Sequence, residues 1–115
     1  MKFELSKYYG LCTTRGRARK VRGLILNQLL PSETILTIDL SGVDIVSMSF
    51  LDELIVCSIK HKFFTNLQIE IIAFSPSTER YLKEAAKIRK VGIDNVRIVK
   101  APANAACKLL SVPSP

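Results

Sequence analysis

Four short apolar segments alternate with three longer amphipathic ones along this chain of 115 residues, and this alternation limits the possible folds most strongly. The segments with the apolar, β-branched or alternating pattern of strands are residues 2–5, 34–40, 68–74 and 96–99. The segments with a helical apolar arc are residues 14–30, 49–63 and 76–91. Strands separated by helices predict an α/β domain, with a mostly parallel or mixed sheet of about four strands and about three helices.

Capping signals place the ends of the predicted helices. The first helix is expected to begin after Thr13 or Thr14 and to stop before Pro31. Ser49 has Asp52 three residues later, which is the spacing of a capping box, so the second helix is expected to begin there. The third helix should begin at Ser75-Pro76 and bury Tyr81, Leu82, Ala85 and Ile88.

Length and composition indicate the number of domains, the cellular compartment and whether the protein is an enzyme. We expect one domain over residues 1–100 and a flexible Ala-, Ser- and Pro-rich tail over 101–115. Three cysteines without a CxxC pair, and a charged N-terminus, favour a reduced cytoplasmic protein without a membrane span. A single histidine and no recognisable catalytic constellation indicate a non-enzyme that needs no metal or cofactor.

Much of the formal charge of +7 comes from a short basic cluster in the first helix, without an acid among its residues. Its members are Arg15, Arg17, Arg19, Lys20 and Arg22. Arginine forks bind phosphate oxygens, so this cluster could contact nucleic acid, and it could equally bind an acidic patch on a protein. A solvated helix face is the third interpretation, and the sequence leaves all three open.

Residues 38–51 read Ile-Asp-Leu-Ser-Gly-Val-Asp-Ile-Val-Ser-Met-Ser-Phe-Leu. This segment resembles the signature of the STAS domain, which is named for sulfate transporters and anti-sigma factor antagonists. The run from Ser49 to Glu53, Ser-Phe-Leu-Asp-Glu, is similar to a STAS-like family of unknown function whose members tend to read Ser-Phe-x-Asp-Glu at this helix start. The resemblance covers roughly residues 34–99 and implies a STAS-like fold.

The resemblance also implies a site of phosphorylation. In antagonists of the STAS class, a kinase-like ATPase that also acts as the anti-sigma factor phosphorylates a serine at this helix start. Met48 occupies the corresponding position here, which leaves Ser49, and after it Ser47, as candidate phosphoacceptors. A phosphate would be stabilised by the free amides of a helix N-terminus, but Ser49 could equally be a plain helix cap.

The function that the resemblance implies is regulatory docking on a protein partner, such as a kinase-like ATPase or an anti-sigma factor. The expected contact surface is the turn 44–49 with the outward side of helix 49–63. Its residues are Asp44, Met48, Ser49, Asp52, Glu53, Val56 and Lys60. A solvated helix face with one stray apolar residue would give the same pattern. The alternative function is nucleic-acid binding through the basic cluster.

Overall fold

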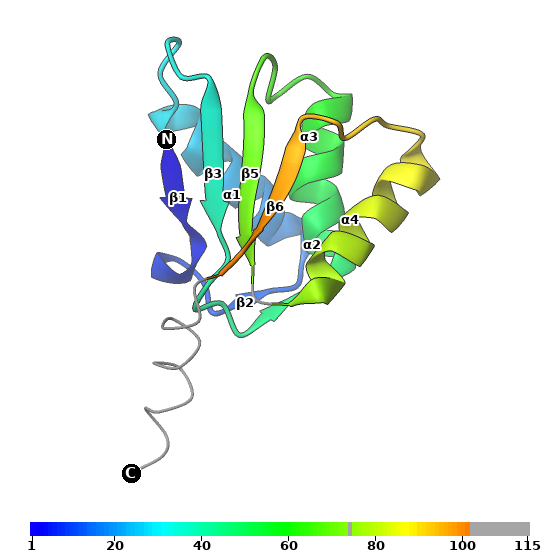
Figure 1. The fold of residues 1–115 in the computed structure, drawn as a ribbon. Helices are drawn as coiled ribbons and strands as arrows, with labels where there is room; N and C mark the ends of the chain where they lie inside the picture. Colours follow the sequence, from blue (N-terminus) through cyan, green and yellow to red (C-terminus); the bar gives the residue numbers. More distant parts are fainter. Residues whose placement is uncertain (74, 102–115) are drawn as a thin grey trace.

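A four-stranded parallel sheet forms the centre of the computed structural model, which describes residues 1–73 and 75–101 (Figure 1). Its strands are β1 (Lys2–Glu4), β3 (Ile35–Asp39), β5 (Gln68–Ala73) and β6 (Val96–Lys100), in the spatial order β1-β3-β5-β6. The predicted α/β, STAS-like class is confirmed. Every strand pair in the described residues is parallel, so the sheet is uniform rather than mixed.

The helices all lie on one face of this sheet (Figure 1). They are α1 (Arg15–Gln28), α2 (Met48–Leu51), the π-helical stretch η2 (Asp52–Val56), α3 (Cys57–Lys60) and α4 (Pro76–Arg89). Successive parallel strands are added in one direction, and right-handed crossovers therefore deliver every helix to the same side. The segments α2, η2 and α3 follow one another without a break, and we call residues 48–60 the central helix.

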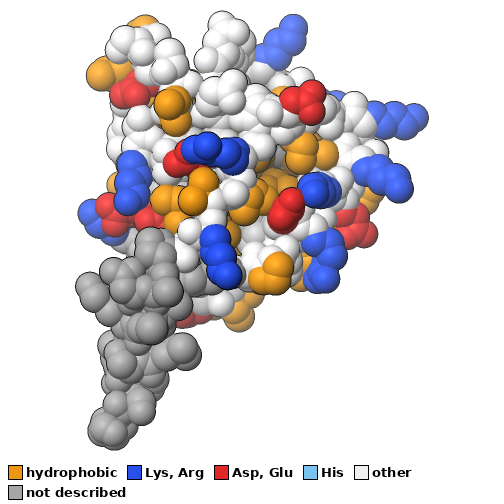
Figure 2. Space-filling model, in the orientation of Figure 1, with side chains coloured by type: hydrophobic (Ala, Val, Ile, Leu, Met, Phe, Trp, Pro, Cys, Tyr) orange, Lys and Arg blue, Asp and Glu red, His pale blue; other side chains and the backbone are white. Residues whose placement is uncertain are grey.

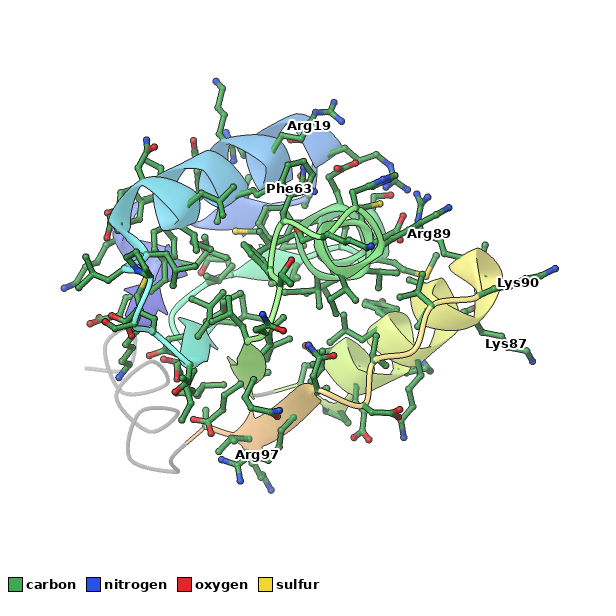
Figure 3. All side chains as sticks on the ribbon, turned by 90° about the horizontal axis from the view of Figure 1, so that it is seen from above. Arg19, Phe63, Lys87, Arg89, Lys90 and Arg97 are labelled. Atoms are coloured by element: carbon green, nitrogen blue, oxygen red, sulfur yellow. The ribbon has the colours of Figure 1, made fainter. Side chains whose placement is uncertain are left out.

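The central helix lies between α1 and α4, as Figure 3 shows from above. Its apolar residues pack with the inward side chains of the sheet, and Phe50, Leu54 and Ile55 are fully buried. On the sheet, Ile38 and Ile71 are register partners and both are buried. The central helix therefore has a neighbour on three sides, and only its outer side and its ends remain near the surface.

The other face of the sheet carries no helix in the described part of the chain. Figure 2 shows apolar side chains gathered near the middle of this face, with charged ones around them. Ile35 is 51% exposed there, and Arg97, which pairs with Glu70, points away from the helices (Figure 3). Parallel sheets are usually covered on both faces, whereas the described residues supply helices to one face of this sheet.

Three short elements were not predicted from the sequence. A 3-10 turn, η1 (Leu5–Lys7), follows β1, and β2 (Leu11–Cys12) pairs in parallel with β4 (Ile45–Val46). This two-stranded ribbon lies below the carboxyl ends of the main strands (Figure 1). Leu11 and Ile45 are register partners in it, and the ribbon leads directly into the central helix.

Several predicted helix ends are corrected. The central helix is capped by Ser47, whose Oγ accepts a hydrogen bond from the Phe50 amide at 3.1 Å, and not by Ser49. The last helix ends at Arg89, because Lys90 adopts a left-handed conformation with φ of 56°. Ile88 was expected in the core but is 68% exposed, and Ala86 is buried in its last turn instead.

The predicted caps Thr14 and Ser75 are confirmed, each accepting a hydrogen bond from a backbone amide of the first helical turn. Ala101, expected to begin the tail, is buried, and its amide donates to the Ala73 carbonyl at 2.9 Å. The remainder of the predicted tail, residues 102–115, lies outside the described residues.

Candidate functional site

Asp52 projects from the central helix into a double arginine contact. Its two carboxylate oxygens accept hydrogen bonds from Arg89 Nε at 2.6 Å and Arg89 Nη2 at 2.7 Å. Arg15 Nη1 donates to Oδ2 from the opposite side at 2.7 Å. Arg15 comes from α1 and Arg89 from α4, so this single carboxylate joins all three helical segments, and only 6% of Asp52 is exposed.

Glu53 makes the corresponding contacts with α1 alone. Arg22 Nη2 donates to Glu53 Oε2 at 2.8 Å, and Arg22 Nε donates to Ser58 Oγ at 2.8 Å. The Arg22 guanidinium also lies over the ring of Phe63, 4.7 Å from its centroid. Arg19 and Arg15 approach the other oxygen of Glu53 at 3.5 and 3.7 Å. We call these six residues the acid–arginine network: Asp52, Glu53, Arg15, Arg19, Arg22 and Arg89.

The local backbone changes where this network begins. The hydrogen-bonding pattern switches from α to π at Asp52 and returns to α at Cys57. A π turn accommodates one more residue than an α turn, and such turns are often found at functional sites. Here the stretch coincides with two consecutive acids that bind arginines on α1 and α4. Among the described residues, no buried side-chain nitrogen or oxygen lacks a hydrogen-bond partner.

The Asp52-Glu53 pair ends the Ser-Phe-Leu-Asp-Glu run, the segment that resembles a STAS-like family of unknown function. A family model described as a STAS-like domain of unknown function (DUF4325) matches residues 17–79, which is more than half of the chain. The chain belongs to this family. The comparisons of this chain with curated proteins and with solved structures found no match.

Within this STAS-like domain, part of the predicted docking surface is not available. Val56 is 0% exposed and Asp52 is buried, so the prediction that both lie on an open helix face is wrong. Glu53 is half-buried in the network, while Lys60 is exposed. The reason is topological: α1 and α4 flank the central helix, and arginines from both cover its outer acids.

The start of the central helix remains accessible. Asp44 and Ile45 are exposed, while Met48 and Ser49 are half-buried. Ser47 is also half-buried, and its Oγ both caps the helix and donates to the Thr13 carbonyl at 3.0 Å. Phosphorylation of Ser49 or Ser47 stays a prediction, and of the two, Ser47 is the one whose hydroxyl has a structural role.

The basic cluster of α1 is largely engaged within the chain. Arg15, Arg19 and Arg22 belong to the acid–arginine network. Arg17 Nη1 donates to the Leu11 carbonyl at 2.6 Å, and its guanidinium lies 4.8 Å from the centroid of the Tyr9 ring. Lys20 is exposed. The nucleic-acid alternative rested on a cluster of cations available to phosphates. Because four of the five side chains have partners within the chain, the structure gives this alternative little support.

The described cysteines and metal-ligating side chains do not indicate a catalytic or metal site. Burial raises the pKa of the Cys12 thiol to about 11 and also raises that of Cys57, so both are poor nucleophiles near neutral pH. Within residues 1–73 and 75–101, no group of three metal-ligating side chains gathers, and no helix has the length and apolarity to cross a membrane.

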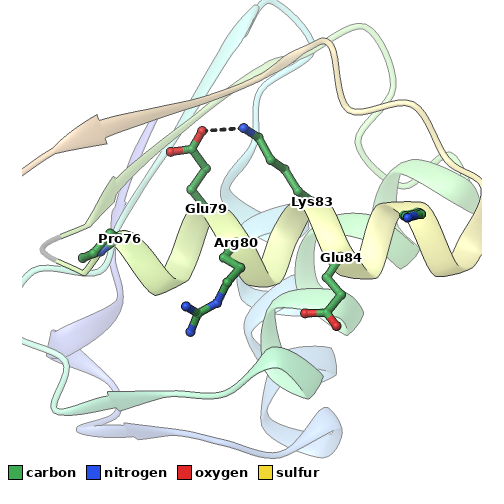
Figure 4. A pocket seen from close by; sticks show the side chains of 6 residues that line it. Pro76, Glu79, Arg80, Lys83 and Glu84 are labelled. Atoms are coloured by element: carbon green, nitrogen blue, oxygen red, sulfur yellow. Dashed lines mark ion pairs between the residues drawn. The ribbon is translucent and has the colours of Figure 1, made fainter.

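One surface hollow, of about 620 Å³, is lined by the side chains of a single helix. Figure 4 shows that its side chains all come from α4, with an ion pair between Glu79 and Lys83 at 2.9 Å. It carries charges of both signs along one exposed helix side. We interpret it as a solvated helix face.

Because of Asp52, the free energy of unfolding of the domain should depend on pH in the acidic range. Burial alone would raise the pKa of its carboxyl, but hydrogen bonds and charge from Arg89 and Arg15 outweigh burial and hold the pKa below the ordinary 3.8. The unfolded chain therefore binds the proton more readily, so the contribution to stability is complete above pH 3.8 and is lost as the pH falls through the folded-state pKa.

We therefore expect Asp52→Asn to lower the free energy of unfolding by about 2 kcal/mol near neutral pH. The difference from wild type should shrink steadily as urea unfolding is repeated at lower pH, below about pH 4. Asp44→Asn, at an exposed carboxylate, is the matched control and should stay within about 0.5 kcal/mol of wild type near neutral pH. A difference between Asp52→Asn and wild type that stays constant with pH would contradict the assignment.

Proposed function

We propose that this STAS-like domain is a regulatory module of the cytoplasm that docks on a protein partner and catalyses no reaction of its own. The proposed docking surface consists of Leu11, Asp44, Ile45, Met48 and Ser49. The partner class that the family resemblance favours is a kinase-like ATPase or an anti-sigma factor. One observation carries the proposal: two large aliphatic side chains are exposed side by side next to the start of the central helix.

These two side chains are Leu11, 47% exposed, and Ile45, 54% exposed, which are register partners in the β2–β4 ribbon. Burying a large aliphatic side chain in an interface stabilises a complex by about 1.5–3 kcal/mol. Asp44, Met48 and Ser49 lie within four residues of Ile45 in the sequence and add a carboxylate, a flexible thioether and a hydroxyl to the proposed surface. An apolar centre with a polar rim is the usual anatomy of a protein interface.

The structure also supports a rigid rather than an adaptable surface. Ser47 ties the ribbon to the helix, because its Oγ is bonded to the Phe50 amide on one side and to the Thr13 carbonyl on the other. The Asp44 amide donates to the Gly10 carbonyl at 2.9 Å, which connects the turn to β2. A preorganised surface loses little conformational entropy on binding, and this favours docking over folding upon binding.

Partner capture from the source cell tests this proposal. Ile45→Lys should reduce recovery of the co-purifying kinase-like ATPase or anti-sigma factor at least about tenfold, because a lysine ammonium replaces a buried aliphatic contact. Ile35→Lys is the matched control, since Ile35 is 51% exposed but lies on the uncovered sheet face. Both variants should retain the wild-type urea midpoint.

Undiminished recovery with Ile45→Lys would contradict the proposed docking surface. Loss of the partner with Ile35→Lys alone would place the interface on the uncovered face of the sheet instead.

A further inference from the structure

A second hollow, separate from that of Figure 4, lies where the central helix, α4 and the start of α1 converge. It has a volume of about 380 Å³. Its lining residues are Arg15, Met48, Asp52, Lys60, Ala85, Ile88, Arg89 and Lys90. Unlike the hollow of Figure 4, it is built by three elements that are far apart in the sequence, and its size falls within the range of small-molecule sites.

The charges around this hollow are strongly unbalanced. Four cationic side chains, those of Arg15, Lys60, Arg89 and Lys90, face a single carboxylate, that of Asp52. The nearby Glu53 is not among the lining residues and is occupied by Arg22. A concave site with an excess of positive charge attracts an anion.

Asp52 positions Arg15 and Arg89 but does not use all of their hydrogen-bond donors. It accepts two hydrogen bonds from Arg89 and one from Arg15. A guanidinium has five N–H donors, so both retain donors for a further acceptor. The side chains of Arg15 and Arg89 are 41% and 29% exposed, so solvent reaches them. Two arginines fixed by a buried carboxylate form a preorganised receptor for a tetrahedral oxyanion.

An apolar wall completes the hollow. It consists of Met48, Ala85 and Ile88, and Ile88 is 68% exposed although it is a large aliphatic residue. None of the lining residues is aromatic, so the hollow offers no ring on which a base could stack. A ligand with a short aliphatic part beside its anionic group would use both kinds of wall.

We propose that this hollow binds a small organic phosphate, with the phosphate on Arg15, Lys60, Arg89 and Lys90 and the organic part against Met48 and Ile88. The net charge of the lining suits a phosphate dianion better than a monoanionic carboxylate. The inference goes beyond the proposed docking function: the hollow shares Met48 with the docking surface, but none of its four cationic residues belongs to that surface.

The test uses the lysines, because the arginines also hold the helices together. Butyl phosphate and inorganic phosphate are titrated into the full chain, with backbone amide shifts followed by NMR. Saturable shifts should concentrate at Met48, Ile88 and Lys90, and butyl phosphate should bind several-fold more tightly than inorganic phosphate. Lys60→Gln with Lys90→Gln should weaken butyl phosphate binding about tenfold, since two charge contacts are lost.

The matched control is Lys20→Gln with Lys100→Gln, which removes the same net charge at exposed sites outside the hollow. It should leave the affinity within about twofold, because distant surface charges are screened. Absence of saturable shifts at millimolar probe, equal affinity for the two phosphates, or equal weakening by both double variants would each overturn the proposal.

Discussion

Replacing Val56 with arginine should unfold this STAS-like domain. Val56 is 0% exposed within the central helix, which is packed between α1 and α4 and against the sheet. A guanidinium there would be buried without a partner and would overfill a close-packed core, at a cost of more than about 4 kcal/mol. Small domains have only about 5–15 kcal/mol of stability in total, so at the lower end of this range the substitution would remove most or all of the stability. Circular dichroism and urea titration measure the loss directly.

His61→Arg is the control for Val56→Arg, because His61 is exposed at the end of the same helix. It should change the free energy of unfolding by less than about 0.5 kcal/mol. The amphipathic pattern alone had placed Val56 on an outward side. If Val56→Arg retained the wild-type urea midpoint, that outward placement would be correct and the packing of the central helix described above would be wrong.

Truncating Glu53 to alanine should cost about 3 kcal/mol of folding free energy, because the buried guanidinium of Arg22 would lose its charge partner. The exposed fractions of the Glu53 and Arg22 side chains are 13% and 10%, so water compensates poorly. Glu84→Ala, an exposed glutamate of α4, should stay within about 0.5 kcal/mol of wild type in the same urea titration. A loss at Glu53 no larger than that of Glu84→Ala would contradict a structural role for the network.

The sequence was sufficient to predict the elements whose signals are local. Four strands and three helical segments followed from apolar periodicity. The cap of the first helix was narrowed to Thr13 or Thr14, and Ser75 was recognised as a cap, because capping depends on residues a few positions apart. The β2–β4 ribbon was missed because two-residue strands have no measurable periodicity. Ser49 was predicted as the cap because its spacing to Asp52 fits a capping box, whereas Ser47 is the cap and Asp52 is held by arginines.

The acid–arginine network could not be predicted from apolar periodicity, because it requires knowing which helices are neighbours. Asp52 and Glu53 could be placed on one side of a helix, and the arginines of α1 on one side of another. Their meeting depends on the strand order β1-β3-β5-β6, which puts α1 and α4 on either side of the central helix. One signal was available in the sequence: Arg15, Arg19 and Arg22 recur at helical spacing, and they complement two consecutive acids on the next predicted helix.

This pairing changes the functional interpretation. Two features that resembled separate binding surfaces, the acidic helix face and the basic cluster, largely neutralise each other inside the domain. The proposals above therefore place partner binding around Leu11 and Ile45, and ligand binding at the basic hollow beside Lys60 and Lys90. The Asp-Glu end of the family motif is accordingly interpreted as architectural, and the half-buried Ser49 at the start of the motif as its accessible part.

A double-mutant cycle between Arg22 and Glu53 tests this central claim most directly. The free energy of unfolding is measured by urea titration for wild type, Arg22→Met, Glu53→Ala and the double variant. If the two side chains are partners, the double variant loses less stability than the sum of the single variants, by about 2 kcal/mol. Additive losses, with a coupling energy near zero, would contradict the assignment of the acid pair and the arginines of α1 to one internal network.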